Sequence, residues 1–132
     1  MRNSLFTSFA ILLAITTLLF AGCTDPEYDG IEISRISSPP KPAQAEINID
    51  GNSFVTKGIS VAISVKPLSG NSNEYKVTDD VDMISQNENV LLVSPSFYKG
   101  VFVLTSFNTG QTCMEVFVNG KSKECIDVSV VE

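Results

Sequence analysis

The sequence property with the strongest consequence for the fold is an alternation of apolar and polar side chains with a period of two. It is clearest in Ile59-Ser60-Val61-Ala62-Ile63-Ser64-Val65, where the apolar members occupy every second position. Successive side chains of a β-strand point to opposite faces of the sheet, so this pattern predicts a strand with one buried and one solvent-facing side. Shorter segments of the same kind begin at Ala45, and no helical periodicity follows residue 22.

Strands at short spacing, separated by turn residues, predict an all-β fold. The expected strands are residues 46–49, 59–65, 75–77, 90–93 and 101–107, with two more closing the chain. Gly, Asn, Ser and Pro lie between them, and the dense cluster at 67–73 predicts a turn. This organisation is typical of an antiparallel β-sandwich or barrel.

The second half of the chain carries a family resemblance. Asn89-Val90-Leu91-Leu92-Val93, Gly100-Val101-Phe102-Val103-Leu104, Asn108-Thr109-Gly110-Gln111-Thr112 and the terminal Asp127-Val128-Ser129-Val130 resemble a bacterial Ig-like domain of the intimin and invasin kind. Those domains have the run of valines, the glycine-centred turn and the terminal strand in this order. The resemblance implies an Ig-like antiparallel β-sandwich, which we place at residues 45–132.

The first 22 residues have the layout of a secretory signal peptide, in which one positive charge precedes an uncharged, largely apolar run. Leu19-Phe20-Ala21-Gly22-Cys23 resembles the lipobox of bacterial lipoproteins, where a large apolar residue and two small ones precede a cysteine. The resemblance implies cleavage before Cys23 and attachment of diacylglycerol to its sulfur, with an amide-linked acyl chain such as palmitate. Two chains give stable anchoring. An uncleaved membrane anchor and an ordinary cleaved signal are the alternatives.

The resemblance to lipoproteins also implies a location in the cell envelope. Thr24, rather than an aspartate, follows the cysteine. In Gram-negative lipoproteins this is typical of passage to the outer membrane, so the outer membrane is expected rather than the inner one if the host is Gram-negative.

Residues 24–44 are expected to be a tether between the lipid and the domain. Four prolines lie among Ser, Asp, Glu, Lys and Gly, a composition too polar to form a core. A flexible coil of this length would have a root-mean-square reach of about 25 Å, from roughly 5 to 6 Å times the square root of the residue number. The alternating segment 31–36 is the exception, since it would form a strand if a sheet edge were available.

The charge and composition of the chain after residue 22 exclude several classes of function. Those 110 residues carry 8 Lys and Arg against 15 Asp and Glu, a net charge of −7. Nucleic acids and anionic lipid surfaces need a positive face, so neither is an expected partner. The chain has no His, which removes the commonest general base and metal ligand. We therefore expect no enzyme activity, no catalytic residue, no cofactor and no small-molecule substrate.

The final two strands predict a disulfide. A two-residue turn at Asn119-Gly120 would put Cys113 and Cys125 on opposite faces, whereas a three-residue loop at 118–120 pairs Phe117 with Lys121 and sets the cysteines opposite each other. In that register Glu115 faces Lys123, and Met114, Val116, Ile126, Val128 and Val130 share the core face with Glu124 as a misfit. Exported domains keep such bonds oxidised. Free thiols and a metal or redox pair are the alternatives, and the spacing supports neither.

Two groups of residues are candidate binding sites. Asp79, Asp80 and Asp82 with Glu74 offer oxygen ligands to calcium, but they lack the glycine-pivoted spacing of a calcium loop, which favours a solvated acidic turn. Phe97 and Tyr98, in the Pro- and Ser-containing loop 95–100, are the candidate contact loop. Alternation sends at least half of the set Phe97, Tyr98, Phe102 and Phe107 inward.

Together these features predict a lipid-anchored envelope protein that presents a small Ig-like domain for non-catalytic binding or adhesion to a protein or glycan partner. One alternative is a structural subunit of an envelope assembly that pairs through an exposed strand edge. Another is a lipoprotein that excludes phages or plasmids. A solvent-facing aromatic loop would favour adhesion, and a long unpaired apolar edge would favour assembly.

Overall fold

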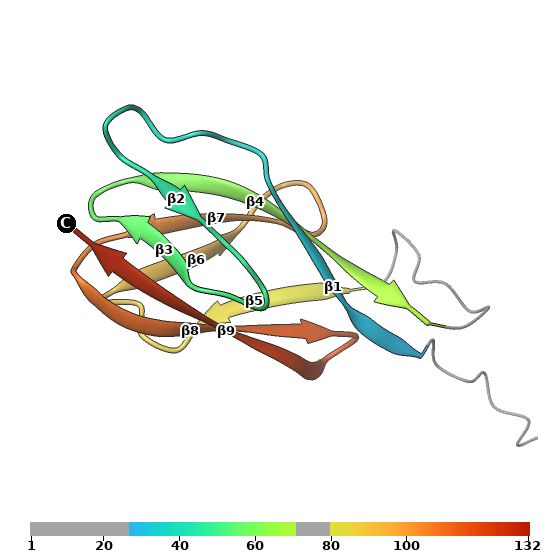
Figure 1. Ribbon diagram of the computed structural model, residues 1–132. Coiled ribbons are helices and arrows are strands. Elements are labelled where there is room, and N and C mark those ends of the chain that lie inside the picture. The colour runs from blue at the N-terminus through green and yellow to red at the C-terminus, as the bar shows by residue number, and fades with distance from the viewer. Residues whose placement is uncertain (1–26, 71–79) are drawn as a thin grey trace, which may run out of the picture.

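The computed structural model describes residues 27–70 and 80–132, and these residues form nine β-strands (Figure 1). The strands are β1 (Tyr28–Arg35), β2 (Ala45–Glu46), β3 (Ser53–Thr56), β4 (Ser60–Ser69), β5 (Val81–Ser85), β6 (Leu91–Pro95), β7 (Val101–Ser106), β8 (Gly110–Val118) and β9 (Lys121–Val131). Within this part of the chain no helix is long and apolar enough to cross a membrane.

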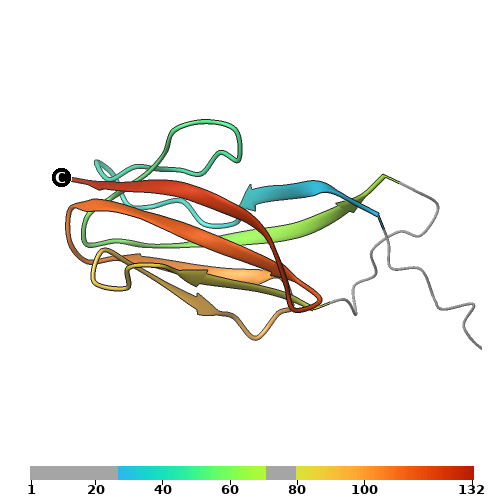
Figure 2. The same cartoon turned by 90° about the horizontal axis from the view of Figure 1, so that it is seen from below.

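The strands form two sheets that pack against each other. One has the order β1-β4-β7-β6 and the other the order β2-β3-β9-β8-β5. All neighbouring strands are antiparallel except β3 and β9, which are parallel. In Figure 2 the two layers lie one behind the other, so that the strands of the two sheets overlap. The predicted all-β sandwich is therefore confirmed, with one parallel pair in place of a wholly antiparallel arrangement.

The core lies between the sheets and follows the period-two pattern of the sequence. In β4 the side chains of Val61, Ile63 and Val65 are at most 3% exposed, while the intervening residues face outward. The opposite sheet contributes the predicted core residues Met114, Val116, Ile126, Val128 and Val130, all of which are buried. Alternation thus fixes which face of each strand is apolar, and burial of those faces holds the two sheets together.

The prediction of a tether at residues 24–44 is wrong for residues 28–35, which form β1. This strand pairs with β4 along the edge of its sheet, with Ile33 opposite Val65 and Arg35 opposite Ile63. Ile31 is 4% exposed and belongs to the core. The domain therefore begins at Tyr28 and not at residue 45, because β4 supplies the edge that this alternating segment needs.

The turn predicted at 67–73 does not include Pro67 to Ser69, because β4 continues through these residues. Pro67 pairs with Ile31 of β1. On its other side β4 pairs with β7 only as far as Ser64, so Pro67 lies where the strand is bonded on one side, a position that tolerates the missing N–H. Residues 71–73, and the strand predicted at 75–77, lie outside the described residues.

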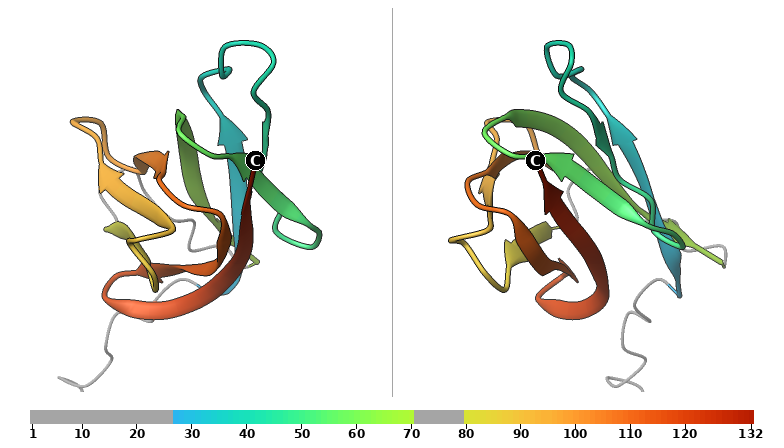
Figure 3. Two further views of the ribbon diagram at one scale, coloured as in Figure 1. Left: turned by 90° about the vertical axis from the view of Figure 1, so that its left-hand side faces the viewer. Right: turned by 60° about the vertical axis from the view of Figure 1, so that its left-hand side comes forward.

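The predicted register of the final hairpin is wrong. Asn119 and Gly120 form a two-residue turn with φ of 50° and 76°, and Val118 pairs with Lys121. Positive φ at both central residues is the geometry of the tight turn that Asn-Gly favours. A bulge then shifts the pairing by one residue: Phe117 pairs with Ser122 and Val116 with Glu124, so Lys123 has no opposite residue. This shift puts Cys113 and Cys125 on the same face of the sheet. The hairpin curves strongly in the end-on views of Figure 3.

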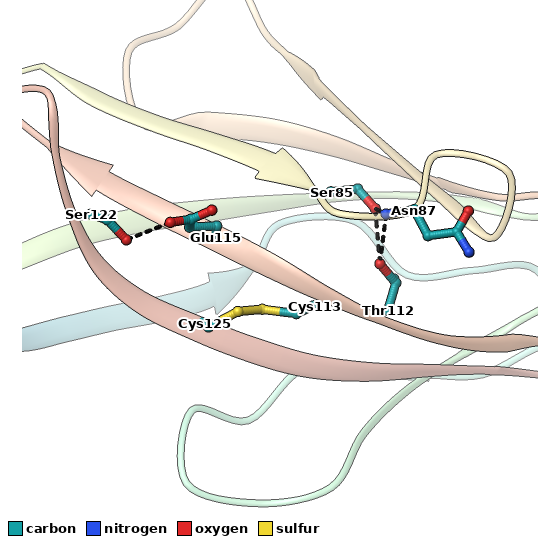
Figure 4. Close-up of a disulfide and its surroundings, with 7 residues drawn as sticks. All are labelled: Ser85, Asn87, Thr112, Cys113, Glu115, Ser122 and Cys125. Carbon is teal, nitrogen blue, oxygen red and sulfur yellow. Dashed lines mark hydrogen bonds between the residues drawn. A yellow bond between two sulfur atoms is a disulfide. The ribbon is translucent and has the colours of Figure 1, made fainter.

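The disulfide between Cys113 and Cys125 is confirmed, although the two cysteines are not directly opposite. Cys113 pairs with Asp127 and Cys125 with Glu115, so the bond crosses the β8–β9 ladder diagonally, with a Cα–Cα distance of 5.7 Å (Figure 4). Both cysteines project from the outer face of the sheet, where Cys113 is buried and Cys125 exposed. The expected pairing of Glu115 with Lys123 is wrong, and Glu115 instead accepts a hydrogen bond from Ser122 Oγ at 2.6 Å.

The connections gather at two ends of the sandwich (Figure 1). The N-terminal end, as we name it, carries the start of β1, the end of β4, the β6–β7 loop and the β8–β9 turn. The C-terminal end carries the chain terminus, the β3–β4 turn and the β5–β6 and β7–β8 connections. An ion pair lies at each end. Lys99 Nζ is 3.7 Å from Asp80 Oδ1 at the N-terminal end, and Lys57 Nζ is 3.1 Å from Glu132 Oε1 at the C-terminal end.

Candidate functional site

The contact loop predicted at 95–100 lies between β6 and β7, where Pro95 is the last residue of β6, and it exposes both of its aromatic side chains. Phe97 is 97% exposed and Tyr98 is 71% exposed. Their rings are in edge-to-face contact with centroids 5.7 Å apart. The loop therefore presents two aromatic rings to the surroundings of the protein, and neither ring contributes to the core.

The backbone of this loop is held in place from both sides. Ser96 N donates to Val101 O at 2.8 Å, and Val101 N donates to Tyr98 O at 3.2 Å, which closes the turn. Val65 N, in β4, donates to Gly100 O at 2.7 Å. Gly100 has a φ of +71°, and a Cβ there would lie 2.8 Å from Val65 O. A glycine is required at this point, because any side chain would collide with the main chain of β4.

The other two aromatic residues of the predicted set are elsewhere. Phe102 points inward and is 2% exposed, whereas Phe107 is 49% exposed at the far end of β7. Since β7 separates Phe107 from the loop, the exposed aromatic rings do not form one surface.

The acidic residues around β5 take part in local contacts. Asp80 N donates to Asn119 Oδ1 at 3.1 Å, and Asn119 N donates to Asp80 O at 2.8 Å. Asp82 Oδ1 accepts from Met83 N. Glu74 and Asp79 lie outside the described residues, and in the described part of the chain no group of three or more His, Cys, Asp or Glu is placed to hold a metal ion.

A groove of about 800 Å³ lies on the outer face of the five-stranded sheet, in the half nearer the C-terminus. Asp127 and Ser129 of β9 form its floor together with Gln111 and Cys113 of β8. Asn52 of the β2–β3 connection and Phe54 of β3 lie at one side of the groove, and Gln86, which follows β5, lies at the other.

Hydrogen bonds fix the wall of the groove that carries Gln86. Gln86 N donates to Cys113 O at 2.9 Å, and Asn87 N donates to Thr112 Oγ1 at 3.0 Å. The hydroxyls of Ser85 and Thr112 are 3.2 Å apart and buried (Figure 4). The segment that leaves β5 is therefore attached to β8 beside the disulfide, and the position of Gln86 is set by the sheet.

The opposite wall is shaped by Ser53, which is 3% exposed. Its Oγ donates to Asn48 O at 2.9 Å and accepts from Asn48 N at 2.8 Å. Asn48 Nδ2 also donates to Asn52 O at 3.4 Å. These bonds fold the β2–β3 connection back on itself and set Asn52 and Phe54 at the edge of the groove.

The lining of the groove suits a polar, hydroxyl-rich or peptide ligand. The amides of Asn52, Gln86 and Gln111 offer both donors and acceptors, and Asp127 offers a carboxylate. No local sequence pattern predicts this site. Alternation along β8 and β9 predicts only which of their residues face outward. Gln86 and Asn52 lie beside those residues because two separate connections pack there, which alternation does not predict.

A second hollow, of about 820 Å³, lies beside the connection from β1 to β2. Arg35 lines it, but the Arg35 guanidinium donates to Ala45 O. Four other polar or charged residues line it as well: Ser38, Lys41, Gln44 and Glu46. Prolines and apolar residues form the rest of the wall: Pro39, Pro42, Ala43, Ala45, Ile47 and Phe54. This hollow therefore offers fewer side-chain hydrogen-bonding groups than the groove.

The sheet edges bear on the alternative of assembly by strand pairing. Among the described strands, β1, β6, β2 and β5 lie at the edges. β2 has two residues, β6 ends in Pro95, and β1 and β5 carry Asp29, Glu32, Arg35 and Asp82. Short length, charge and proline all oppose the addition of another strand. None of these edges is the long apolar edge that would favour assembly.

Cys23, the predicted site of lipid attachment, lies outside the described residues. The described chain begins at Glu27, immediately before β1, at the N-terminal end of the sandwich (Figure 1).

No family model matches the chain, and no curated protein matches it. Among solved structures, a crystal structure of the S-layer protein rSbsC(31-844) is similar, with a TM-score of 0.52 and 18% identity over 83% of this chain and 14% of that one. The structure of SbsC domains 4 and 5 has a TM-score of 0.48 and 17% identity over 83% of this chain and 55% of that one. This chain thus spans less than two thirds of each of these proteins. At such identity the likeness to the first of them shows one property, the β-sandwich fold.

Proposed function

We propose that this chain is a lipid-anchored envelope protein whose sandwich binds a protein or glycan partner without catalysis, through the groove on its five-stranded sheet. The observation that carries the proposal is the convergence of Asn52, Gln86, Gln111 and Asp127 from four separate segments on one hollow. Such convergence of polar groups beside an aromatic edge, here Phe54, is typical of a binding site.

The chemistry of the groove supports recognition over reaction. Asp127 is the one carboxylate among its described lining residues, and the sequence contains no His to act as a base beside it. Sugar hydroxyls and peptide amides both pair with Asn, Gln and Asp side chains, while Phe54 offers an apolar surface. The location in the envelope is supported by the lipobox sequence at 19–23 and by the likeness of the fold to a domain of an S-layer protein.

The test compares three forms of the acylated protein by cross-linking and affinity capture from intact cells. The first is the wild type, and the second is Gln111→Ala with Asp127→Ala, two exposed groove residues. The matched control is Ser60→Ala with Thr105→Ala, which removes a polar pair from the outer face of the other sheet, where their hydroxyls are 2.9 Å apart. We expect the wild type and the control to recover the same partner and the groove variant to lose it several-fold.

Two results would count against the proposal. Equal recovery by all three forms would remove the groove as the contact surface. Mass spectrometry that found the mature protein starting before residue 23, or without added lipid mass, would remove the anchor.

A further inference from the structure

We propose that Phe97 and Tyr98 insert into the head-group region of the membrane that carries the lipid on Cys23, so that this loop contacts lipid and not the binding partner. The inference rests on the lipid attachment of the proposed function, and it adds the orientation of the domain on the bilayer.

The chain between the lipid and the sandwich is short. Four residues, 24–27, separate Cys23 from Tyr28, the first residue of β1. Whatever their conformation, the five-residue step from Cys23 to Tyr28 spans at most about 18 Å, from roughly 3.3 to 3.6 Å a residue. The start of β1 therefore stays close to the bilayer, and the domain is not free to stand off at the distance expected of the 21-residue tether.

The aromatic loop lies toward the end of the sandwich where β1 starts. Figures 1 and 2 place the start of β1, the β8–β9 turn and the β6–β7 loop toward the same end of the sandwich, away from the C-terminus. Contacts link the last two of these: Lys99 pairs with Asp80, and Asp80 exchanges hydrogen bonds with Asn119. The end that a lipid on Cys23 would hold at the membrane is thus the end that displays the aromatic rings.

Contact of both the start of β1 and the loop with the bilayer requires the domain to be inclined to the membrane. β4 continues beyond Ser64, which pairs with Val101, to Ser69, which pairs with Tyr28, so β1 and β4 extend past the loop. A surface that touches both the start of β1 and the loop is therefore oblique to the strands. The sandwich would lie inclined on the bilayer, with the side that carries the β6–β7 loop facing the lipid.

The rings of Phe97 and Tyr98 are chemically suited to the head-group region of a membrane. Water-exposed aromatic rings gain by entering the boundary between head groups and acyl chains, where Tyr keeps its hydroxyl hydrated. Lys99 adjoins them with 63% of its side chain exposed, and its aliphatic stem is suited to the same depth. No positive face is needed, since the contact is apolar and the lipid on Cys23 supplies the attachment.

The orientation has a consequence for the groove. Gln111, Asp127 and Gln86 lie in the half of the domain nearer the C-terminus. With the aromatic loop at the bilayer, this half points away from the membrane, where a partner can reach it. The two surfaces therefore have separate roles.

The test uses tryptophan as a depth probe, because the chain contains none. Phe97→Trp places the probe in the loop, and Phe107→Trp is the matched control at the opposite end of β7, where the native ring is 49% exposed. Each full-length acylated variant is reconstituted into phosphatidylcholine vesicles with and without lipids brominated near the head group. We expect the fluorescence of Phe97→Trp to shift to shorter wavelength and to be quenched several-fold more strongly than that of Phe107→Trp.

Equal quenching of the two variants, with both confirmed as acylated by mass spectrometry, would overturn the inference and leave the anchor intact. A protein without lipid mass would instead overturn the proposed function on which it rests. Phe97→Ser with Tyr98→Ser gives an independent check in the capture experiment. Retention of the partner supports a lipid-facing loop, and a several-fold loss of the partner would assign the loop to partner binding.

Discussion

Tyr28 Oη donates a hydrogen bond of 2.5 Å to Glu124 Oε1, across 96 positions of the sequence. The bond joins the first strand, in the four-stranded sheet, to the last hairpin, in the five-stranded sheet. Lys123 Nζ lies 5.1 Å from the centroid of the Tyr28 ring and adds a cation–π contact. Glu124, the misfit on the apolar face of β9, thus has a partner that the sequence pattern did not reveal.

Tyr28→Phe should lower the free energy of unfolding by about 1 kcal/mol, the usual net value of a hydrogen bond, because it removes the donor to a partly buried carboxylate and keeps the ring beside Lys123. Urea unfolding of both proteins measures the difference. Tyr98→Phe, at a ring that is 71% exposed, is the control and should change stability by less than about 0.5 kcal/mol. Equal effects of the two substitutions would mean that the bond to Glu124 does not stabilise the fold.

Ile31→Ala should lower the free energy of unfolding by about 2 to 5 kcal/mol, because it removes a side chain that is 4% exposed in the core. Ile36→Ala, five residues further on and 58% exposed, is the matched control and should be close to neutral. Thermal or urea unfolding distinguishes them. If both substitutions were neutral, residues 28–35 would not be part of the folded domain.

Cys113→Ala with Cys125→Ala should lower the free energy of unfolding by about 3 kcal/mol, because the disulfide closes a short loop and restricts the unfolded chain. The cysteines are 12 positions apart. Reduction of the wild type should produce a similar loss, measured by urea unfolding with and without a reductant, and should leave the double variant unchanged. A reductant effect of equal size on the double variant would show that the loss has another source.

Gly100→Ala should be more destabilising than Gly58→Ala, although both positions have positive φ, of +71° and +80°. A left-handed conformation costs an alanine about 1 to 2 kcal/mol in either case. At Gly100 the new Cβ would also lie 2.8 Å from Val65 O, whereas nothing lies within 4 Å at Gly58. Urea unfolding of the two variants measures the difference, and equal losses would mean that the β6–β7 loop moves away from β4 without cost.

The local features of this protein could be predicted from its amino-acid pattern. Alternation set which side chains of β4, β8 and β9 are buried, including Val61, Ile63 and Met114, because a strand sends neighbouring residues to opposite faces regardless of its partners. The same parity placed Cys113 and Cys125 on one face and predicted their disulfide. The exposure of Phe97 and Tyr98 followed from a loop of turn residues between two apolar runs.

Features that depend on partners far away in the chain became evident only in the folded protein. The register of β8 and β9 is set by the bulge at Lys123. A two-residue turn without this extra residue would put the two cysteines on opposite faces of the sheet. β1 is a strand because β4 extends beside it, and the groove exists because Asn52 and Gln86 are brought to the outer face of β8 and β9 by separate connections. Such placements are absent from a local pattern, since pairing and packing energies depend on residues tens of positions apart.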